Sequence, residues 1–289
     1  MPPNLPAAAV RAAAVRAAVS AAARLGVPCD DPVVLADGAN IVVHLCPSPV
    51  VAKVAASTPA VRPDTAAWLR RELDIAVFLW QAGIPVMAPA SEVPATVHRE
   101  DGHVMSFWTY IEPSGAGRPD EDTIGSMLRD LHAALRAYPG AWPVLTPLGD
   151  IPAFLARPQT LLTPGDVALL ADTYGRLTAE LAAAPGAVQV LHGDAGIGNL
   201  MPADGRRVWH DFEDTCSGPV EWDLAATTAS PRLDASRILA AYGVPVDKAR
   251  LRVCERLRRL HLTIWYALYA ERLPGCRQRA AELLQSWRA

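Results

Sequence analysis

HGDAGIGN at residues 192–199, followed by HDFE at residues 210–213, is the part of this 289-residue chain that decides the fold. It places Asp194 five residues before Asn199, and Asp211 twelve residues after Asn199. Phosphoryl transfer uses these groups, because one carboxylate orients the attacking hydroxyl and accepts its proton, while an amide oxygen and a second carboxylate hold Mg²⁺. The spacing fits the loop pattern H-x-D-x-x-x-x-N with a metal-binding Asp after it.

The residues around these two stretches have the pattern of short strands. Residues 188–191 (VQVL) form a largely apolar run before the first stretch, and residues 207–209 (RVW) lead into the second. Residues 202–205 (PADG) are typical of a turn, so two strands would bring the three polar groups together. The alternative is that Asp194 and Asn199 only cap a turn. Three groups at the correct spacing favour the catalytic interpretation.

Lysine is rare in this chain, which has only Lys53 and Lys248 against twenty-five arginines. Lys53 lies in the apolar β-type run VVAKVAA at residues 50–56, where kinases carry the lysine that grips the nucleotide phosphates. A compact ammonium on a flexible stem reaches between phosphate oxygens differently from a planar guanidinium. The alternative is a lysine on a solvent-facing edge strand.

Glu72, nineteen residues after Lys53, is the expected partner of that lysine. It lies in RRELDIAVFLWQAGIPV at residues 70–86, a predicted helix. The apolar residues at helical spacing are Leu69, Leu73, Ala76, Val77 and Trp80. In kinases a helix supplies the acid that positions the lysine. Asp74 is the rival acid but points to another face of the helix, and an ordinary surface charge pair is the alternative role for Glu72.

The loop DGAN at residues 37–40 is predicted to be a hairpin turn between the strands VVLA and IVVHL. The chain has neither a full G-x-G-x-x-G loop nor G-x-x-x-x-G-K-[ST], which excludes a P-loop fold. Backbone N–H groups of Gly38 and Asn40 are expected near the nucleotide phosphates. An ordinary hairpin turn is the alternative interpretation.

The motif HGD…GN together with GPVEWDLA at residues 218–225 resembles the motifs of the aminoglycoside phosphotransferase and choline kinase family. The motif order follows that family from about Asp37 to Ala226. The resemblance implies an α+β, protein-kinase-like fold of two lobes. The N-lobe, residues 1–110, would be a small antiparallel sheet that binds the nucleotide. The C-lobe, residues 111–289, would be mainly helical and carry catalysis and substrate binding.

The resemblance also implies the role of each motif residue in transfer of a γ-phosphoryl group. Asp194 would orient or deprotonate the acceptor hydroxyl, and Asn199 and Asp211 would bind Mg²⁺. Lys53, held by Glu72, would clamp the phosphates of ATP or GTP. Positioning and charge neutralisation would supply most of the rate, because this transition state needs little covalent help.

Three further acids near the motifs are candidates for supporting roles. Asp223 in GPVEWDLA is implied by the resemblance to brace the catalytic loop. Many family members have a second histidine inside the loop where this chain has Gly196, and this departure weakens the inference of substrate. Glu213 and Asp214 either assist the metal or contact a polar substrate.

The lobe boundary is predicted after the apolar strand VMSFWTYI at residues 104–111, which runs into PSGAG. In a kinase-like chain this strand end is the hinge. Backbone groups of Trp108, Thr109 and Tyr110 would then hydrogen-bond the adenine ring.

Two further helices follow from composition. The Ala-rich residues 7–26 could pass for an organelle presequence, but they favour a helix that packs on the small lobe and stops at Gly26. Residues 121–139 predict another helix. Its apolar stripe is Ile124, Leu128, Leu131 and Leu135. His132 on this helix is interpreted as a core residue rather than a base.

Composition excludes several classes of protein. Half of the chain is hydrophobic (51%), yet no apolar run approaches the length of a membrane span. The net charge is −3, and the arginines form no recognisable nucleic-acid motif. The five cysteines have no C-x-x-C pairing, which is typical of reduced thiols in a cytoplasmic protein. We therefore expect no nucleic acid or membrane partner, and the oligomeric state stays open.

The charge distribution gives a clue to the acceptor. Residues 247–289 carry a net charge of +6, and residues 30–246 carry −12. An acidic large lobe favours polycationic antibiotics, whereas the basic C-terminal stretch argues against a substrate face built from those helices. Residues 255–273 are amphipathic, so their arginines can face solvent. Their aromatic residues, Trp265, Tyr266 and Tyr269, wall a substrate cleft or belong to the core.

The sequence thus predicts a small-molecule kinase whose acceptor is a hydroxyl of an antibiotic, as in a resistance enzyme. A sugar, an amino alcohol or another metabolite is the alternative acceptor. An HD-type metallophosphohydrolase is an alternative of another class, because His192 and Asp194 with His210 and Asp211 superficially fit its ligands. It leaves Lys53 without a role. A catalytically silent kinase fold is the third alternative, and nothing in the motifs favours it.

Overall fold

Five strands between residues 29 and 109 form an antiparallel sheet with the strand order β1-β2-β3-β5-β4. The strands are β1 (Cys29–Asp37), β2 (Asn40–Pro47), β3 (Val50–Ala55), β4 (His98–Glu100) and β5 (His103–Thr109). The computed structural model describes residues 6–112, 117–158, 160–184, 186–203 and 205–288. Lys53 lies on the central strand β3, opposite Val42 of β2 and Ser106 of β5. It is therefore not an edge-strand lysine.

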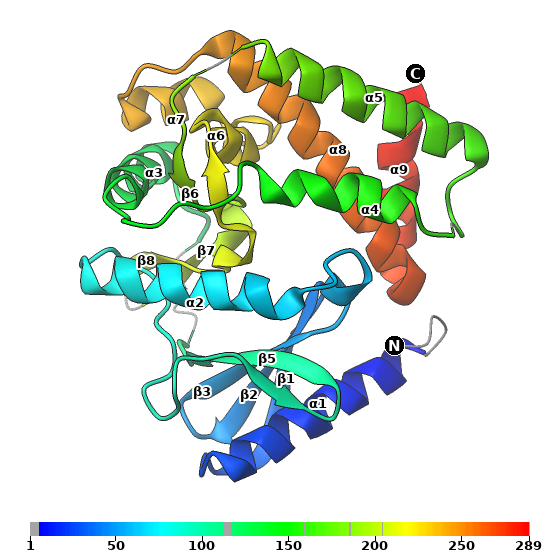
Figure 1. Ribbon diagram of the computed structural model, residues 1–289. Helices are drawn as coiled ribbons and strands as arrows, with labels where there is room; N and C mark the ends of the chain where they lie inside the picture. The colour runs from blue at the N-terminus through cyan, green and yellow to red at the C-terminus, as the bar shows by residue number, and fades with distance from the viewer. Residues whose placement is uncertain (1–5, 113–116, 159, 185, 204, 289) are drawn as a thin grey trace.

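Helix α1 (Ala7–Arg24) lies against this sheet (Figure 1). Ala14, Ala17 and Ala21 are fully buried. Their small side chains allow the helix to approach the sheet closely. The chain leaves the helix through Gly26, whose φ of +75° favours glycine. The predicted Ala-rich helix on the small lobe is confirmed.

Helix α2 (Thr65–Gln81) lies between the sheet and the helical part of the molecule (Figure 1). Asp64 caps its first turn by accepting a hydrogen bond from the N–H of Ala67. Of the apolar residues at helical spacing, Trp80 is 60% exposed, whereas its neighbour Leu79 is fully buried. Asp74 is exposed on the face opposite Glu72, as expected.

The rest of the chain is mainly helical, with its own core. Its helices are α3 (Glu121–Leu135), α4 (Asp150–Leu155), α5 (Pro164–Ala182), α6 (Glu221–Thr228), α7 (Ala235–Tyr242), α8 (Lys248–Arg272) and α9 (Arg277–Arg288). Short 3₁₀ turns are η1 (Thr58–Ala60), η2 (Thr146–Gly149), η3 (Ile197–Asn199), η4 (Phe212–Asp214) and η5 (Pro274–Cys276). The expected two-lobe α+β fold is confirmed.

Helix α3 shows why the apolar stripe could be predicted. The residues of the stripe are Ile124, Leu128, Leu131 and Leu135, and all four are fully buried. The helix begins at Glu121 as predicted, because the carboxylate of Asp120 accepts a hydrogen bond from the N–H of Thr123, but it ends at Leu135 rather than at residue 139.

Two small two-stranded sheets flank the motif residues. β6 (Gln189–Leu191) pairs with β9 (Cys216–Gly218), and β7 (Leu200–Ala203) pairs with β8 (Arg206–Trp209), all antiparallel. The predicted strands before the two motif stretches are therefore confirmed. They belong to different sheets, so β6 and β8 are not partners, and the motif residues lie in the connections between the sheets.

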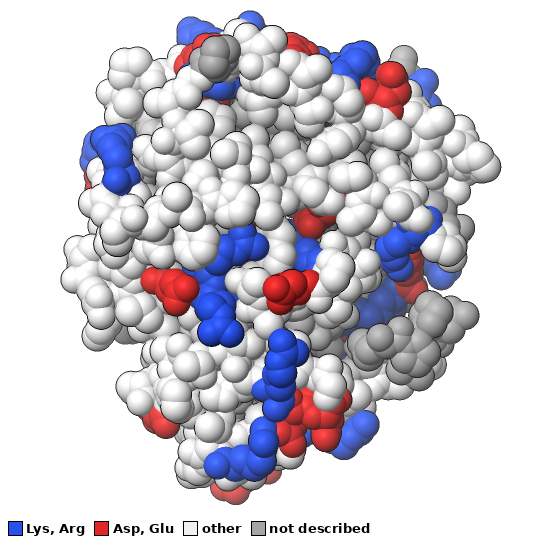
Figure 2. All heavy atoms as spheres, in the orientation of Figure 1, with Lys and Arg blue, Asp and Glu red and all other residues white. Residues whose placement is uncertain are grey.

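The surface drawn in Figure 2 is mostly uncharged, with positive and negative side chains interspersed. Within the described ranges, no helix is long and apolar enough to cross a membrane. All five cysteines are free thiols.

Candidate active site

Lys53 lies at the centre of three carboxylates, which the sheet, α2 and the chain after β8 bring together. Its Nζ is 2.9 Å from both Oε1 and Oε2 of Glu72, 2.5 Å from Oδ1 of Asp211 and 3.1 Å from Oε2 of Glu213. The lysine side chain is 9% exposed, and that of Glu72 is 2% exposed. The predicted lysine–glutamate pair is therefore formed and buried.

The electrostatics of this cluster follow from burial and crowding. Burial lowers the pKa of Lys53, but Asp211 and Glu72 outweigh it and raise that pKa well above its usual value. Burial raises the pKa of Glu72 to about 8, against the opposing effect of Lys53. Burial also acts to raise the pKa of Asp211, but Lys53 and His210 lower it to about 2.

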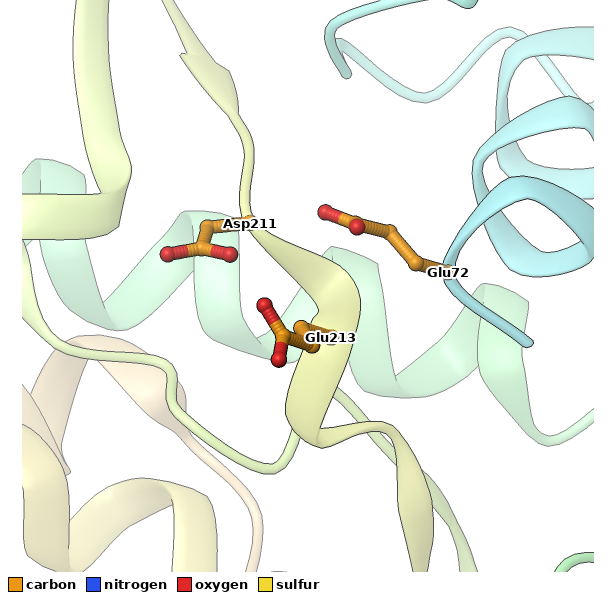
Figure 3. Close-up of side chains that lie close together, drawn as sticks. All are labelled: Glu72, Asp211 and Glu213. Carbon is orange, nitrogen blue, oxygen red and sulfur yellow. The ribbon is translucent and has the colours of Figure 1, made fainter. Parts of the chain in front are cut away.

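Figure 3 shows Glu72 extending from α2 toward Asp211 and Glu213, which lie on the turn after β8. One carboxylate oxygen of each lies within 4.8 Å of the other two, a spacing that metal sites also have. Here Lys53 is within hydrogen-bond distance of all three. The three acids therefore form an ion-pair cluster with the lysine rather than a closed metal cage.

Arg62 extends the cluster and was not foreseen from the sequence. Its guanidinium is 2.6 Å from Oδ2 of Asp150, 3.2 Å from Oε1 of Glu213 and 2.7 Å from Oδ1 of Asp214. The side chain is 2% exposed and stacks on Trp68, with 3.7 Å between the guanidinium carbon and the ring centroid. Arg62 therefore fixes Glu213 and Asp214, the two acids that the sequence left without an assigned role.

Asp194 lies at the end of the loop after β6 and is held from two sides. Nδ2 of Asn199 donates to the Asp194 carbonyl at 2.8 Å and to its Oδ2 at 3.0 Å. Arg258 of α8 forms an ion pair with Oδ1 and donates to the carbonyl of Gly193 at 2.7 Å. Asp194 is therefore oriented by one predicted residue, Asn199, and by one that sequence reasoning missed, Arg258.

Asp223 at the start of α6 braces the loop of Asp194 through the backbone of His192 and Gly193. Its carboxylate accepts the N–H groups of His192 and Gly193, each at 2.8 Å, and lies 3.1 Å from Nε2 of His132. Burial acts to raise the pKa of Asp223, but the hydrogen bond and charge of His132 outweigh it and lower that pKa. The expected bracing role is confirmed, and His132 is part of it besides being buried in the core.

Gly193 and His192 show why the loop needs these residue types. Gly193 has a φ of +86°, and a Cβ there would lie 1.8 Å from the carbonyl oxygen of Asp214, so only glycine fits. Nδ1 of His192 accepts the N–H of Asp194 at 3.2 Å, so its Nε2 donates to the carbonyl of His210 at 3.1 Å. Burial lowers the pKa of His192 and keeps the ring neutral.

The candidate ligands Asn199 and Asp211 both offer oxygen atoms, the type of ligand atom that Mg²⁺ prefers. Because Nδ2 of Asn199 donates to Asp194, its amide oxygen is left as a ligand, and Lys53 engages only Oδ1 of Asp211. Oxygen donors of this kind suit Mg²⁺. Carboxylates outnumber cations here even when Glu72, whose pKa is raised to about 8, is left out, and this excess favours a divalent ion: Lys53, Arg62 and Arg258 face Asp150, Asp194, Asp211, Glu213 and Asp214.

A cleft of about 540 Å³ lies between the sheet and the turn after β8. All predicted nucleotide-binding residues line it, namely Gly38, Asn40, Lys53, Glu72, Trp108, Thr109 and Tyr110. Apolar side chains of Val42, Val51 and Met87 complete its walls, and such a lining suits a flat adenine ring. We call it the nucleotide cleft.

The hinge differs from expectation in one respect. The N–H of Thr109 donates to the carbonyl of Ala88 at 3.0 Å, and that of Tyr110 donates to Pro49 at 2.9 Å. These two N–H groups are therefore not available to an adenine ring. Ile111, the next residue, also lines the cleft.

A second, smaller cleft of about 140 Å³ lies on the other side of Asp211; we call it the acceptor cleft. Its charged wall consists of Arg62, Asp194, Asp211, Glu213, Asp214 and Arg258. Its other wall comes mainly from α8, with His261, Leu262, Trp265 and Tyr269. Ala39, Asp211 and Tyr269 line both clefts.

Helix α8 thus contributes more than the sequence suggested. The expectation that its basic residues only face solvent is wrong for Arg258, whose side chain is 13% exposed and contacts Asp194. Trp265 and Tyr269 of the same helix line the acceptor cleft, so the net positive charge of the C-terminal stretch does not keep α8 away from this cleft. No short motif marks these residues; the helical spacing of 258, 262, 265 and 269 is their only sequence signal.

The comparisons with known proteins identify the family of the chain. Residues 36–254 match the model of the phosphotransferase enzyme family. Because the match spans more than half of the chain, the protein belongs to this family. No curated protein matches the chain.

Several solved structures share the fold. Amicoumacin kinase hAmiN, in complex with AMP-PNP, Ca²⁺ and Ami, has a TM-score of 0.70 at 14% identity, over 93% of this chain and 92% of that one. Choline kinase LicA from Streptococcus pneumoniae has a TM-score of 0.64 at 17% identity, over 94% and 98%. Aminoglycoside phosphotransferase APH(3'')-Id from Streptomyces rimosus has 0.54 at 19%, over 80% and 92%.

The expected resemblance and enzyme class, a small-molecule phosphotransferase, are confirmed by the family match. The HD-type metallophosphohydrolase is wrong, since its His–Asp pairs need helices and these follow β6 and β8. His192 is buried, and its ring nitrogens are engaged by the backbone of Asp194 and His210.

Proposed function

We propose that this phosphotransferase moves the γ-phosphoryl group of ATP or GTP to a hydroxyl of a small molecule. The observation that carries the proposal is that the nucleotide and acceptor clefts meet at Asp211. Lys53 lines only the nucleotide cleft and Asp194 only the acceptor cleft. A γ-phosphoryl group at their junction would lie between the nucleotide and the hydroxyl beside Asp194.

On the donor side, residues 1–110 form the nucleotide-binding lobe in this proposal. Lys53 binds phosphate oxygens as a point charge, and Glu72 keeps its ammonium aimed into the cleft. The hairpin with Gly38 and Asn40 covers the phosphates. Because the N–H groups of residues 109 and 110 are engaged, adenine bonds to carbonyl groups of the Trp108–Tyr110 segment or to the backbone of Ile111.

On the acceptor side, within the lobe of residues 111–289, Asp194 orients the hydroxyl and takes its proton. Oδ2 is fixed by Asn199 and Oδ1 by Arg258, so the carboxylate cannot rotate freely. Holding the hydroxyl in line with the phosphoryl group supplies most of the rate. The buried brace at Asp223 keeps the loop in this geometry.

Asn199 and Asp211 would hold Mg²⁺ through one amide oxygen and one carboxylate oxygen. The ion supplies charge neutralisation at the phosphate oxygens when bound. The excess of carboxylates over cations around the site supports this assignment.

As acceptor we propose an antibiotic, which would make the protein a resistance enzyme. The acceptor cleft combines carboxylates such as Asp214 with the aromatic rings of Trp265 and Tyr269. Carboxylates and aromatic faces both attract ammonium groups. The likeness of fold to an amicoumacin kinase and an aminoglycoside phosphotransferase agrees with this choice.

A small amino alcohol is the second candidate acceptor. The observation that favours it is the size of the acceptor cleft, about 140 Å³, which holds a small molecule rather than a whole multi-ring antibiotic. An antibiotic would have to extend past Leu262, which is 42% exposed at the rim. A choline kinase shares the fold.

The test is to incubate purified protein with Mg²⁺ and ATP or GTP against a panel of acceptors and to read added phosphate by mass. The panel contains aminoglycosides, peptide antibiotics, choline, amino alcohols, amino sugars and homoserine. Phosphorylation of an antibiotic supports the resistance role. Phosphorylation only of a metabolite keeps the kinase and discards that role. Bound nucleotide with no transfer to any acceptor contradicts the proposed activity and favours the silent-kinase alternative.

We place the reaction in the cytoplasm, where ATP is available. Five free thiols, two of them fully buried, agree with a reducing compartment.

A further inference from the structure

The last residue of α8 crosses to the N-lobe and holds the β1–β2 hairpin. Arg272 forms an ion pair with Oδ1 of Asp37 and donates to the carbonyl of Gly38 at 2.5 Å. Its Nε also donates to Oγ of Ser57 at 3.3 Å. The side chains of Arg272 and Asp37 are each only 10% exposed. One planar guanidinium therefore holds the tip of the hairpin by two contacts and joins it to Ser57, after β3, by a third.

The other side of the hairpin is anchored at the lysine cluster. Nδ2 of Asn40 donates to Oε2 of Glu213 at 2.6 Å, and the same oxygen lies 3.1 Å from Nζ of Lys53. Residues 37–40 line the nucleotide cleft. The hairpin thus covers the end of the cleft where the phosphates would bind, and the hinge with Tyr110 forms the other end.

The same helix also forms the wall of the acceptor cleft. Trp265 and Tyr269 line that cleft, and Tyr269 lies three residues before Arg272. A short piece of α8 therefore contacts both the acceptor side and the hairpin on the nucleotide side.

We propose that Arg272 is a positioning residue that holds the hairpin closed over the nucleotide phosphates. This inference rests on the proposed function of the nucleotide cleft. Arg272 contacts the hairpin rather than the nucleotide, so it acts through the backbone of Gly38 and its neighbours. A guanidinium is required, because a lysine ammonium cannot reach the Asp37 carboxylate, the Gly38 carbonyl and the Ser57 hydroxyl as one rigid fork.

The chain contains a matched control on the same carboxylate. Nε of Arg11 lies 2.8 Å from Oδ2 of Asp37, but the Arg11 side chain is 50% exposed. An exposed ion pair of this kind contributes little. Arg11→Gln removes one charge from Asp37 and leaves the Arg272 contacts intact.

The experiment measures the affinity of the full chain for ATP, ADP and adenosine in Mg²⁺ by calorimetric titration. We expect Arg272→Gln to weaken ATP and ADP binding about tenfold and adenosine binding less than about twofold, because adenosine has no phosphates to be covered. Arg272→Lys should lie between wild type and Arg272→Gln. Arg11→Gln should stay within about twofold of wild type for every ligand.

A second variant keeps the proposal testable if Arg272→Gln unfolds, as judged by thermal unfolding. Asp37→Asn removes the ion pair but keeps the Gly38 contact, and it should weaken ATP about threefold with adenosine unchanged. Equal affinity of wild type and variants for ATP overturns the inference and leaves the proposed function standing. Equal loss of ATP and adenosine also overturns it, because that indicates a structural role. A wild-type protein that binds no nucleotide overturns the proposed function itself.

Discussion

The nucleotide cleft and the acceptor cleft share Asp211 but are built in different ways. The nucleotide cleft takes most of its walls from neighbouring strands, their hairpin and α2, with Tyr269 of α8 at its edge, and its charged groups are Lys53 and the acids around it. The acceptor cleft is assembled by arginines that come from far along the chain, Arg62 and Arg258. Ion pairs between distant parts of the chain hold both clefts together. The residues of the nucleotide cleft, however, stand in motifs that the sequence shows, whereas no motif marks the arginines of the acceptor cleft.

Substitution of Asp211, which lines both clefts, should have the largest effect on activity. We expect Asp211→Asn to lower turnover at least about a thousandfold, roughly 4 kcal/mol, because Lys53 loses a partner and Mg²⁺ loses a carboxylate ligand. Steady-state kinetics over a Mg²⁺ titration measure this. The control is Asp74→Asn on the exposed face of α2, which should behave as wild type. Retained activity with an unchanged Mg²⁺ dependence would remove Asp211 from the metal site.

Breaking the support of the catalytic loop should cost stability. Asp223→Ala leaves the N–H groups of His192 and Gly193 without their acceptor in a buried site, and we expect a loss of about 3–5 kcal/mol of unfolding free energy. Because the pKa of Asp223 is lowered in the folded protein, its stabilising contribution is present at neutral pH and is lost as pH falls through that pKa.

Urea unfolding at neutral pH measures the effect of Asp223→Ala. Asp130→Asn is the control, since the Asp130 side chain is 61% exposed, and it should change stability by less than about 0.5 kcal/mol. Equal unfolding curves for Asp223→Ala and wild type would show that the loop does not depend on this brace.

Arg258 lines the acceptor cleft but not the nucleotide cleft, so its substitution should affect the two clefts differently. Arg258→Gln should lower turnover about thirtyfold, because Asp194 loses its partner on Oδ1, and leave ATP affinity within about twofold. Single-turnover kinetics and nucleotide titration measure the two effects. Arg256→Gln on the same helix is the control, because the Arg256 side chain is 46% exposed and pairs with Glu180. A loss of ATP affinity equal to the loss of turnover would contradict the separation.

The smallest effect tests the packing of α2 behind the nucleotide cleft. Trp80→Ser should change the unfolding free energy by less than about 0.5 kcal/mol, since Trp80 is 60% exposed. Leu79→Ala next to it should cost about 2–5 kcal/mol, because Leu79 is fully buried. Similar losses in both variants would mean that the helix is rotated from the orientation described.

The predictable part of the site is the part that local spacing determines. Lys53 and Glu72 could be paired from the sequence because a strand and the following helix bring them together. Asp194, Asn199 and Asp211 followed from their spacing around a tight turn. The apolar stripe of α3 also followed from periodicity, whereas in α2 the helical spacing includes the exposed Trp80 and omits its buried neighbour Leu79.

The unpredicted part depends on tertiary contacts. Twenty-five arginines with no distinguishing spacing gave no signal that Arg62 and Arg258 would be partly or fully buried against acids. The engaged N–H groups of residues 109 and 110 arise from contacts with Ala88 and Pro49, which no motif marks. Net charge is a poor guide to the acceptor for the same reason, because tertiary contacts decide which charged side chains line the acceptor cleft.

The central claim is that Asp194 acts on the acceptor hydroxyl at the junction of the two clefts. The most direct measurement compares wild type and Asp194→Asn for phosphorylation of the acceptor found in the panel, with ATP affinity measured on the same samples. We predict that product formation falls at least about a thousandfold while ATP affinity changes less than about twofold. Undiminished turnover of Asp194→Asn would contradict the claim.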